Sequence, residues 1–360
     1  MRGFVREDFE GWRGLVHFWL LVLCLLTVAG VVLQWLGPPS PSPPVRDSRT
    51  APSPVPGPEA LTAAKPAEPR PEPVTEAVSR PGRDLPGPVA DPDPALLEPD
   101  PASTGQSLPK IALDGRMPMQ VYAAGFDRPT RRTRVGLLLA GFGLNEADSA
   151  AAARALPGGI TFAISPYFNG DLRKLLDVVR AHEHEYLLSV PMEPSNFPAN
   201  DPGPQALMTD QTPIENLKRL NWSLSRLAGY AGVTAALGTM HGERFLAVPD
   251  QLESVLTVLS QRGLLFVDSR KGDVMLPRVW HRGIDLVIDE PANPEAIEVR
   301  LAELTKLAIT NGTALGLATT PRPVTIERIA AWANGLMDKG LALAPVSALA
   351  RPPADPEPAR

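Results

Sequence analysis

The chain has 360 residues, a formal net charge of −5 and a single cysteine, Cys24. A slightly acidic chain without a basic, aromatic-rich patch gives no reason to expect a nucleic-acid partner. One cysteine excludes an intramolecular disulfide. The length would allow two domains, but the composition indicates one, because a long stretch of the chain is rich in proline.

An apolar run occupies residues 15–36 and is broken only by His17, Thr27 and Gln34. As a helix it would extend roughly 33 Å, which is enough to cross the hydrocarbon core of a bilayer. We therefore expect a retained transmembrane anchor, preceded by a cytoplasmic segment of residues 1–14. A cleaved signal peptide is the alternative, but its apolar region is usually about 7–15 residues long.

Basic residues flank the apolar run unevenly. Arginines precede it at Arg2, Arg6 and Arg13, and the next ones follow at Arg46 and Arg49. Because basic residues favour the cytoplasmic side, this bias weakly predicts that the N-terminus lies inside the cell. The C-terminal part would then lie in the periplasm of a Gram-negative cell, held at the inner membrane by one helix.

Half of the 42 prolines fall between Pro38 and Pro109. Such a stretch cannot bury enough apolar surface to fold, so residues 37–110 are expected to form a disordered linker. It is either a spacer that reaches from the membrane to the cell wall or a low-complexity tether without a binding role. Residues 350–360 predict a short, Pro-rich disordered tail.

Residues 134–349 alternate short apolar strands with helices. Strands are expected at 135–140, 160–164, 186–190, 233–237, 264–267, 286–288, 314–318 and 343–346. Helices are expected at 146–155, 172–179, 214–227 and 252–259, from Pro294 onward, and at 325–338. This alternation predicts an α/β fold, an irregular (β/α) barrel of about seven parallel strands, with any chemistry at the carboxyl ends of the strands.

The loops after the expected strands carry most of the candidate contact residues. These are Tyr167, Glu193, His241, Arg244, Asp268 and Arg270. The first strand differs, because it ends in Ala140-Gly141 without a polar side chain. No Gly-rich phosphate loop, Gly-x-Ser-x-Gly elbow or His-Glu-x-x-His helix is present in the sequence.

Several blocks of the sequence resemble the divergent polysaccharide deacetylase family. They are Pro191-Met192-Glu193-Pro194, Pro202-Gly203-Pro204, Gly242 with Arg244-Phe245, Arg262-Gly263-Leu264, Phe266-Val267-Asp268-Ser269-Arg270, and Leu343-Ala344-Pro345-Val346-Ser347. The resemblance covers residues 134–349 in the family's order. It implies a barrel of parallel strands, an exported location and a carbohydrate-related role.

The resemblance also implies a divalent metal, usually zinc, held by an aspartate and histidines, with a second aspartate as base. The positions in this chain depart from that pattern. Ala140-Gly141 stands where the family has Asp-Asp, and Ser189 and Met240 stand where it has histidines. Thr320 replaces the histidine of a Gly-His-Pro motif. No ligand role carries over, so no cofactor is expected.

A rearranged zinc site through His241 and Asp268, with Glu243, is the alternative, because a catalytic zinc needs about three protein ligands. Without zinc, the pKa of the attacking water stays near 15.7 rather than about 7. That difference amounts to roughly 12 kcal/mol in forming hydroxide. The candidate contact residues also have structural interpretations: Asp268 and Arg270 as an ion pair, and Glu193 as an acceptor for backbone donors.

Three functions remain open from the sequence. The first is a catalytically inactive, membrane-anchored relative of the deacetylases that binds cell-envelope glycan or an envelope protein. The second is an active, metal-dependent carbohydrate deacetylase with rearranged ligands. The third is a structural scaffold of the envelope.

Overall fold

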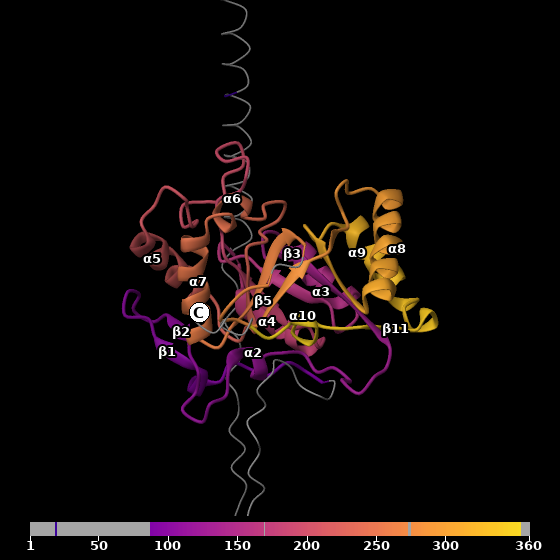
Figure 1. The fold of residues 1–360 in the computed structure, drawn as a ribbon, viewed down its shortest axis with the longest axis horizontal. Coiled ribbons are helices and arrows are strands. Elements are labelled where there is room, and N and C mark those ends of the chain that lie inside the picture. The colour runs from indigo at the N-terminus through magenta and orange to yellow at the C-terminus, as the bar shows by residue number, and fades with distance from the viewer. Residues whose placement is uncertain (1–18, 20–86, 169, 273–274, 354–360) are drawn as a thin grey trace, which may run out of the picture. The chain divides into compact units, whose positions relative to one another are not determined.

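The structure is a computed structural model that describes Trp19 and residues 87–168, 170–272 and 275–353 (Figure 1). The expected segment at 1–14, the expected anchor at 15–36 apart from Trp19, and the linker up to residue 86 lie outside these residues. Among the described residues, no helix combines the length and the apolar character needed to span a bilayer. Residues 87–353 belong to one compact unit.

The centre of this unit is a single sheet in which neighbouring strands are parallel. Its order is β8-β7-β6-β5-β4-β3-β10-β9, and β11 pairs with the first residues of β3. The strands are β3 (Thr133–Phe142), β4 (Thr161–Ile164), β5 (Tyr186–Ser189), β6 (Gly232–Thr234), β7 (Leu265–Lys271), β8 (His281–Ile284), β9 (Leu286–Val287), β10 (Thr313–Ala318) and β11 (Leu341–Leu343).

The two ends of the sheet meet in one segment of the chain. Only Asp285 separates β8, which pairs with β7, from β9, which pairs with β10. The eight strands of the main path therefore form a nearly closed, barrel-like sheet. This confirms the expected α/β fold with parallel strands.

Helices follow most of the strands and cover the outside of the sheet (Figure 1). They are α3 (Glu146–Ala155), α4 (Leu172–Ala181), α5 (Pro213–Leu224), α6 (Glu243–Leu246), α7 (Pro249–Gln261), α8 (Pro294–Asn311) and α9 (Pro323–Asn334), with a 3₁₀ turn at Met337–Lys339. The short helix α10 (Val346–Leu349) instead packs against the inner face of the sheet. Local signals fix several starts: Asn145, Asp171, Thr212 and Asn293 each cap a helix through a side-chain oxygen.

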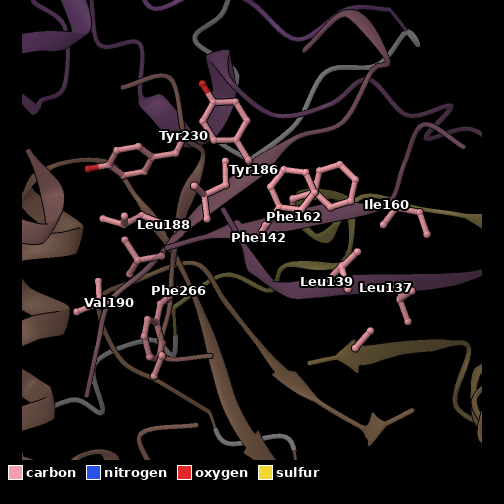
Figure 2. Close-up of a cluster of buried hydrophobic side chains, with 14 of the residues drawn as sticks. Leu137, Leu139, Phe142, Ile160, Phe162, Tyr186, Leu188, Val190, Tyr230 and Phe266 are labelled. Carbon is pink, nitrogen blue, oxygen red and sulfur yellow. The ribbon is translucent and has the colours of Figure 1, made fainter. Parts of the chain in front are cut away.

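The strands are apolar on both faces, so one hydrophobic cluster lies on each side of the sheet. The outer cluster packs under the helices; it includes Leu137, Leu139 and the stacked rings of Phe142 and Phe162, whose centroids lie 4.2 Å apart (Figure 2). The inner cluster fills the barrel with the alternate residues, such as Leu138. Burial on both faces is typical of parallel sheets and explains why the strands read as continuous apolar runs.

The expected linker at 37–110 is wrong at its C-terminal end. Residues 94–109 form a 3₁₀ turn (Pro94–Leu96) and an antiparallel hairpin of β1 (Leu97–Pro99) and β2 (Ser107–Pro109). The reason is burial, since Leu96 and Leu108 are at most 2% exposed in the hydrophobic clusters. These apolar side chains give the segment a core contact that proline content alone does not reveal.

The hairpin and α2 (Pro118–Val121) lie at the amino ends of the barrel strands. Leu96 and Met119 belong to the inner cluster, and Asp91 pairs with Arg180 at the end of α4. Figure 1 shows α2 and α6 at opposite ends of the unit. The chain therefore enters the barrel at the end opposite to the strands' carboxyl ends.

The expected tail at 350–360 also needs correction. His281 begins β8 and is fully buried, and its backbone exchanges two hydrogen bonds with Arg351. Arg351 thus adds to the edge of the sheet, while residues 354–360 lie outside the described part. The last strand is β11 rather than 343–346, because the chain after Leu343 turns into α10.

We expect Asp285→Ala to lower the free energy of unfolding by about 3 kcal/mol, because it breaks a buried ion pair at the closure of the barrel. Asp285 Oδ2 pairs with the buried Arg282 and accepts the N–H of Leu315 on β10 at 2.7 Å. Urea unfolding would measure the loss. The exposed Asp338→Ala is the control, and an equal, small effect of both changes would contradict the prediction.

Candidate functional site

Gly141 occupies a bulge at the carboxyl end of β3. Leu139 pairs with Phe162 and Phe142 with Ile164, so β3 contains one more residue than β4 over this stretch. Gly141 has a φ of 67°, which suits glycine in such a bulge. Its side chain would have no room: a β-carbon there would lie 2.8 Å from the carbonyl oxygen of Thr319 and 3.6 Å from Cα of Gly238.

Ala140, the neighbouring position, is equally closed. It is fully buried and belongs to the inner cluster together with Ala163, Ala236 and Leu317. The end of β3 is thus packed against the backbone at the end of β10 and against the loop after β6. Small side chains at 140 and 141 allow this approach of backbone segments.

Ser189 lies at the carboxyl end of β5. It is two residues after Leu187, which belongs to the inner cluster, so its side chain points to the interior of the barrel. Ser189 is fully buried, and its hydroxyl makes no hydrogen bond within the described part of the chain. A buried hydroxyl without a partner is uncommon, because its desolvation is not offset.

His241 follows a tight turn in which Leu237 and Met240 exchange backbone hydrogen bonds. Its Nδ1 lies 3.6 Å from Glu243 Oε1, and its carbonyl accepts a hydrogen bond from Ser269 Oγ at 2.5 Å. The Nε2 atom is buried and has no partner among the described residues. The sequence placed His241 at a strand's carboxyl end, and the structure brings it beside the end of β7.

Asp268 and Arg270 form an ion pair with an Nη2–Oδ2 distance of 2.6 Å, and Arg270 also donates to the carbonyl of Leu246 at 2.8 Å. Phe266, two residues before Asp268, packs in the outer cluster. Asp268 therefore points to the helix side of β7, away from the barrel interior. The expected ion pair is present, and it links β7 to α6.

Glu193 and Arg244 are also joined. Glu193 is 3% exposed, and its Oε1 lies 3.0 Å from Arg244 Nη1. Its Oε2 accepts from the N–H and the hydroxyl of Thr209, at 2.6 and 2.7 Å. The two contacts with Thr209 hold the Pro191–Pro194 segment against the loop at Thr209, and one of them is the expected backbone donor.

Tyr167 packs inside a loop contact rather than presenting a free ring. The ring of Trp222 lies 5.5 Å from it, and a β-carbon on Gly203 would lie 2.7 Å from its hydroxyl. That hydroxyl accepts the N–H of Gln205 at 3.1 Å. Burial raises the pKa of Tyr167, so the phenol stays protonated near neutral pH.

Asp289 and Thr319 form a contact whose role the sequence does not disclose. Asp289 is 1% exposed and accepts the N–H of Thr319 at 2.8 Å, together with the hydroxyl of Thr319 and the N–H of Thr320. Burial raises the pKa of Asp289, and these hydrogen bonds oppose the rise. The carboxylate fixes the end of β10, the segment that closes over Gly141.

The candidate residues thus fall into separate groups. Ser189 and His241 bring unpaired polar atoms to the strand ends, while the Asp268–Arg270 and Glu193–Arg244 pairs hold loops. Within residues 87–168, 170–272 and 275–353, no three histidine, cysteine, aspartate or glutamate side chains form a group that could hold a metal ion. His241 and Asp268 in particular do not meet as ligands, because Asp268 is committed to Arg270 on the helix side.

Residues 137–350 match the model of the divergent polysaccharide deacetylase family. The chain belongs to this family. It is similar to the crystal structure of an uncharacterized protein, ATU2773, from Agrobacterium tumefaciens C58, with 30% identity and a TM-score of 0.62. That match covers 68% of this chain and 99% of the other.

A more remote similarity links this chain to a structure described as T48 deacetylase with substrate. The identity is 12% and the TM-score 0.37, over 63% of this chain and 98% of the other. A similarity this low indicates nothing about the mechanism of this chain. No curated protein matches the chain. The family therefore rests on the sequence match and on the first structure.

Proposed function

We propose that this member of the divergent polysaccharide deacetylase family no longer hydrolyses glycan. It instead binds cell-envelope glycan at the carboxyl ends of its barrel strands. The observation that carries the proposal is the packing around Gly141. The family's acidic pair would stand at Ala140-Gly141, and the Thr319 carbonyl and Gly238 already fill the space beside Gly141. A carboxylate there would force the backbone at Thr319 to shift, because the β-carbon alone would lie 2.8 Å from its carbonyl oxygen.

The other positions support the same conclusion. Ser189 and Met240 stand where histidines would ligate zinc, and neither a hydroxyl nor a thioether is a usual zinc ligand. His241 has one carboxylate neighbour, Glu243, at 3.6 Å. The described side chains therefore do not fit a catalytic zinc, and we derive no hydrolytic step from them.

The carboxyl ends of the strands can still bind a ligand, because two polar atoms there are buried and unpaired. Ser189 Oγ can donate or accept, and the neutral His241 ring can accept at Nε2 if Glu243 favours the proton on Nδ1. Both atoms have almost no solvent-accessible surface, so a sugar hydroxyl would reach and satisfy them only after the loop around His241 moves. Ligand hydrogen bonds to such atoms would offset the desolvation that the free protein bears.

We further propose that the apolar run at 15–36 anchors the chain in the inner membrane with the barrel in the periplasm. The described chain enters at the amino ends of the strands, where Asp91 and Leu96 contact the barrel. A tether on that side would leave the opposite, carboxyl ends of the strands accessible. Protease accessibility in spheroplasts would test the placement of the domain.

We expect the purified full chain to sediment with insoluble cell-wall glycan and to release no acetate from acetylated glycan fragments, with or without added zinc. His241→Ala and Ser189→Ala should each weaken glycan retention by about fivefold, as expected for one lost hydrogen bond. Ser189→Ala should leave thermal stability unchanged, because its hydroxyl has no partner among the described residues.

The exposed His182, at the end of α4, supplies the matched control for His241→Ala. His182→Ala should retain glycan as the unmodified chain does. Zinc-dependent acetate release that His241→Ala abolishes would instead establish an active deacetylase with rearranged ligands. Equal glycan retention by all variants would place any binding elsewhere than at the strand ends.

A further inference from the structure

A groove on the flank of the barrel, separate from the strand ends, lies between the β1–β2 hairpin and helices α5 and α7. Its volume is about 380 Å³, within the range of small-ligand sites. The hairpin lies outside residues 137–350, the part that matches the family. The groove therefore combines a segment that precedes the family domain with two helices of the barrel.

The wall between the hairpin and α7 is held in place by Arg262. Its Nη1 donates to Glu98 Oε1 at 2.9 Å and to the carbonyl of Pro109 at 2.7 Å. Gly263 packs next to it so closely that a β-carbon would lie 3.0 Å from Ile111 Cγ1. These contacts fix the shape of the groove before any ligand binds, which lowers the entropic cost of binding.

The groove carries polar groups without protein partners. Asn221 on α5 and Gln261 on α7 line it, and neither side-chain amide makes a hydrogen bond in the part of the chain that the structure describes. Lys110 lines it as well and has no carboxylate partner among those residues. Since Glu98 is paired with Arg262, Lys110 leaves the groove with one positive charge in excess.

The remaining lining is apolar. Leu217 on α5 and Val258 on α7 face the groove together with Ile111, and all three side chains are half-buried. A ligand with a carboxylate, an amide and a small apolar group would match the lysine, the two amides and this apolar lining at once. The carboxyl end of a short peptide combines these three features in adjacent atoms.

We propose that this groove binds the carboxyl terminus of a short peptide with small side chains. The carboxylate pairs with Lys110, the last peptide amide bonds to Asn221 and Gln261, and a methyl-sized side chain contacts Leu217 and Val258. Charge-assisted hydrogen bonds between Lys110 and the carboxylate would orient the peptide in the groove. The site is independent of the glycan binding proposed for the strand ends.

Titration calorimetry of the full chain with N-acetyl-alanyl-alanine tests the proposal. We expect saturable binding in the millimolar range or tighter, and at least about tenfold weaker binding of the C-terminal amide, which lacks the charge. The L,L and D,D forms of the peptide report the handedness that the groove selects. Absence of saturable binding by both forms, or equal binding of acid and amide, would overturn the proposal.

Variants locate the binding. Lys110→Met and Gln261→Met should each weaken binding of the acid by about fivefold to tenfold without changing the unfolding temperature, since neither side chain has a protein partner among the described residues. Lys218→Met, on the exposed side of α5, is the matched control. His241→Ala should leave peptide binding intact. If it abolishes binding, the peptide occupies the strand ends and the groove proposal is wrong.

Discussion

Replacing Glu185 with alanine should lower the free energy of unfolding by about 3–5 kcal/mol. Glu185 is fully buried at the amino end of β5. Its carboxylate accepts three hydrogen bonds: from the N–H of Ala124 at 3.1 Å, the hydroxyl of Thr161 at 3.0 Å and the N–H of Ser347 at 2.9 Å. Truncation leaves buried donors unpaired and opens a cavity.

These donors explain why one side chain has so large an expected effect. Ala124 follows α2, Thr161 begins β4 and Ser347 lies in α10, so the carboxylate joins three segments that are distant in the sequence. Together they close the amino end of the barrel. Chemical denaturation at constant pH would measure the loss, with the exposed Glu295→Ala as control. A change below about 1 kcal/mol for Glu185→Ala would contradict this role.

Glu185 also gives a pH dependence with a defined sign. Burial raises the pKa of its carboxyl above the usual value of about 4.5, although the hydrogen bonds oppose the rise. Because the pKa of Glu185 is higher in the folded than in the unfolded state, protonated Glu185 contributes to stability below the unfolded-state pKa. This contribution is lost as the pH rises through the folded-state pKa. The wild type should therefore lose stability relative to Glu185→Gln as pH rises from about 4.5.

Gly141→Asp, which restores an acidic residue at the family's position, should destabilise the fold by more than about 3 kcal/mol and create no zinc site. The left-handed φ of 67° costs a non-glycine residue about 1 kcal/mol or more. The β-carbon would also lie 2.8 Å from the Thr319 carbonyl oxygen and 3.5 Å from Cα of Thr320, so the backbone of this segment would have to shift.

A matched change at Gly340 separates the cost of the backbone conformation from the cost of the steric contact with Thr319. It has a φ of 73°, and no atom lies within 4 Å of a β-carbon built there. Gly340→Asp should therefore cost only about 1 kcal/mol, the backbone part of the effect. Urea unfolding of both variants and zinc analysis of the purified proteins would test the difference. Normal stability of Gly141→Asp with a bound equivalent of zinc would end the proposal that the strand ends have lost hydrolysis.

The helices were readable from the sequence because their signals are local. The expected helix at 146–155 has these same limits in the structure, and Pro294 begins α8 as expected. Side-chain caps and first-turn prolines act within one turn, so no partner segment is needed to recognise them. Most of the sheet was readable for a similar reason, since strands buried on both faces give continuous apolar runs.

Other elements could not be found this way. β8 contains His281, Arg282 and Gly283, and no apolar run predicts a strand there. Burial of Arg282 beside Asp285 depends on β7 and β10, which lie on either side of the segment. The β1–β2 hairpin was assigned to the linker for the same reason: Leu96 becomes a core residue only when the barrel provides its surroundings.

The sequence alone shows the alternation of strands and helices, the resemblance to the family, and Ala140-Gly141 at the position where the family has an acidic pair. The apolar pattern along the chain suffices for the first of these, and the other two follow from the resemblance of short motifs to the family. Only the tertiary structure decided that Gly141 lies in a bulge closed by Thr319 and Gly238, and that Asp268 points away from the barrel interior. Both depend on strand register and on backbone segments distant in sequence, and a linear pattern does not encode the contacts between them.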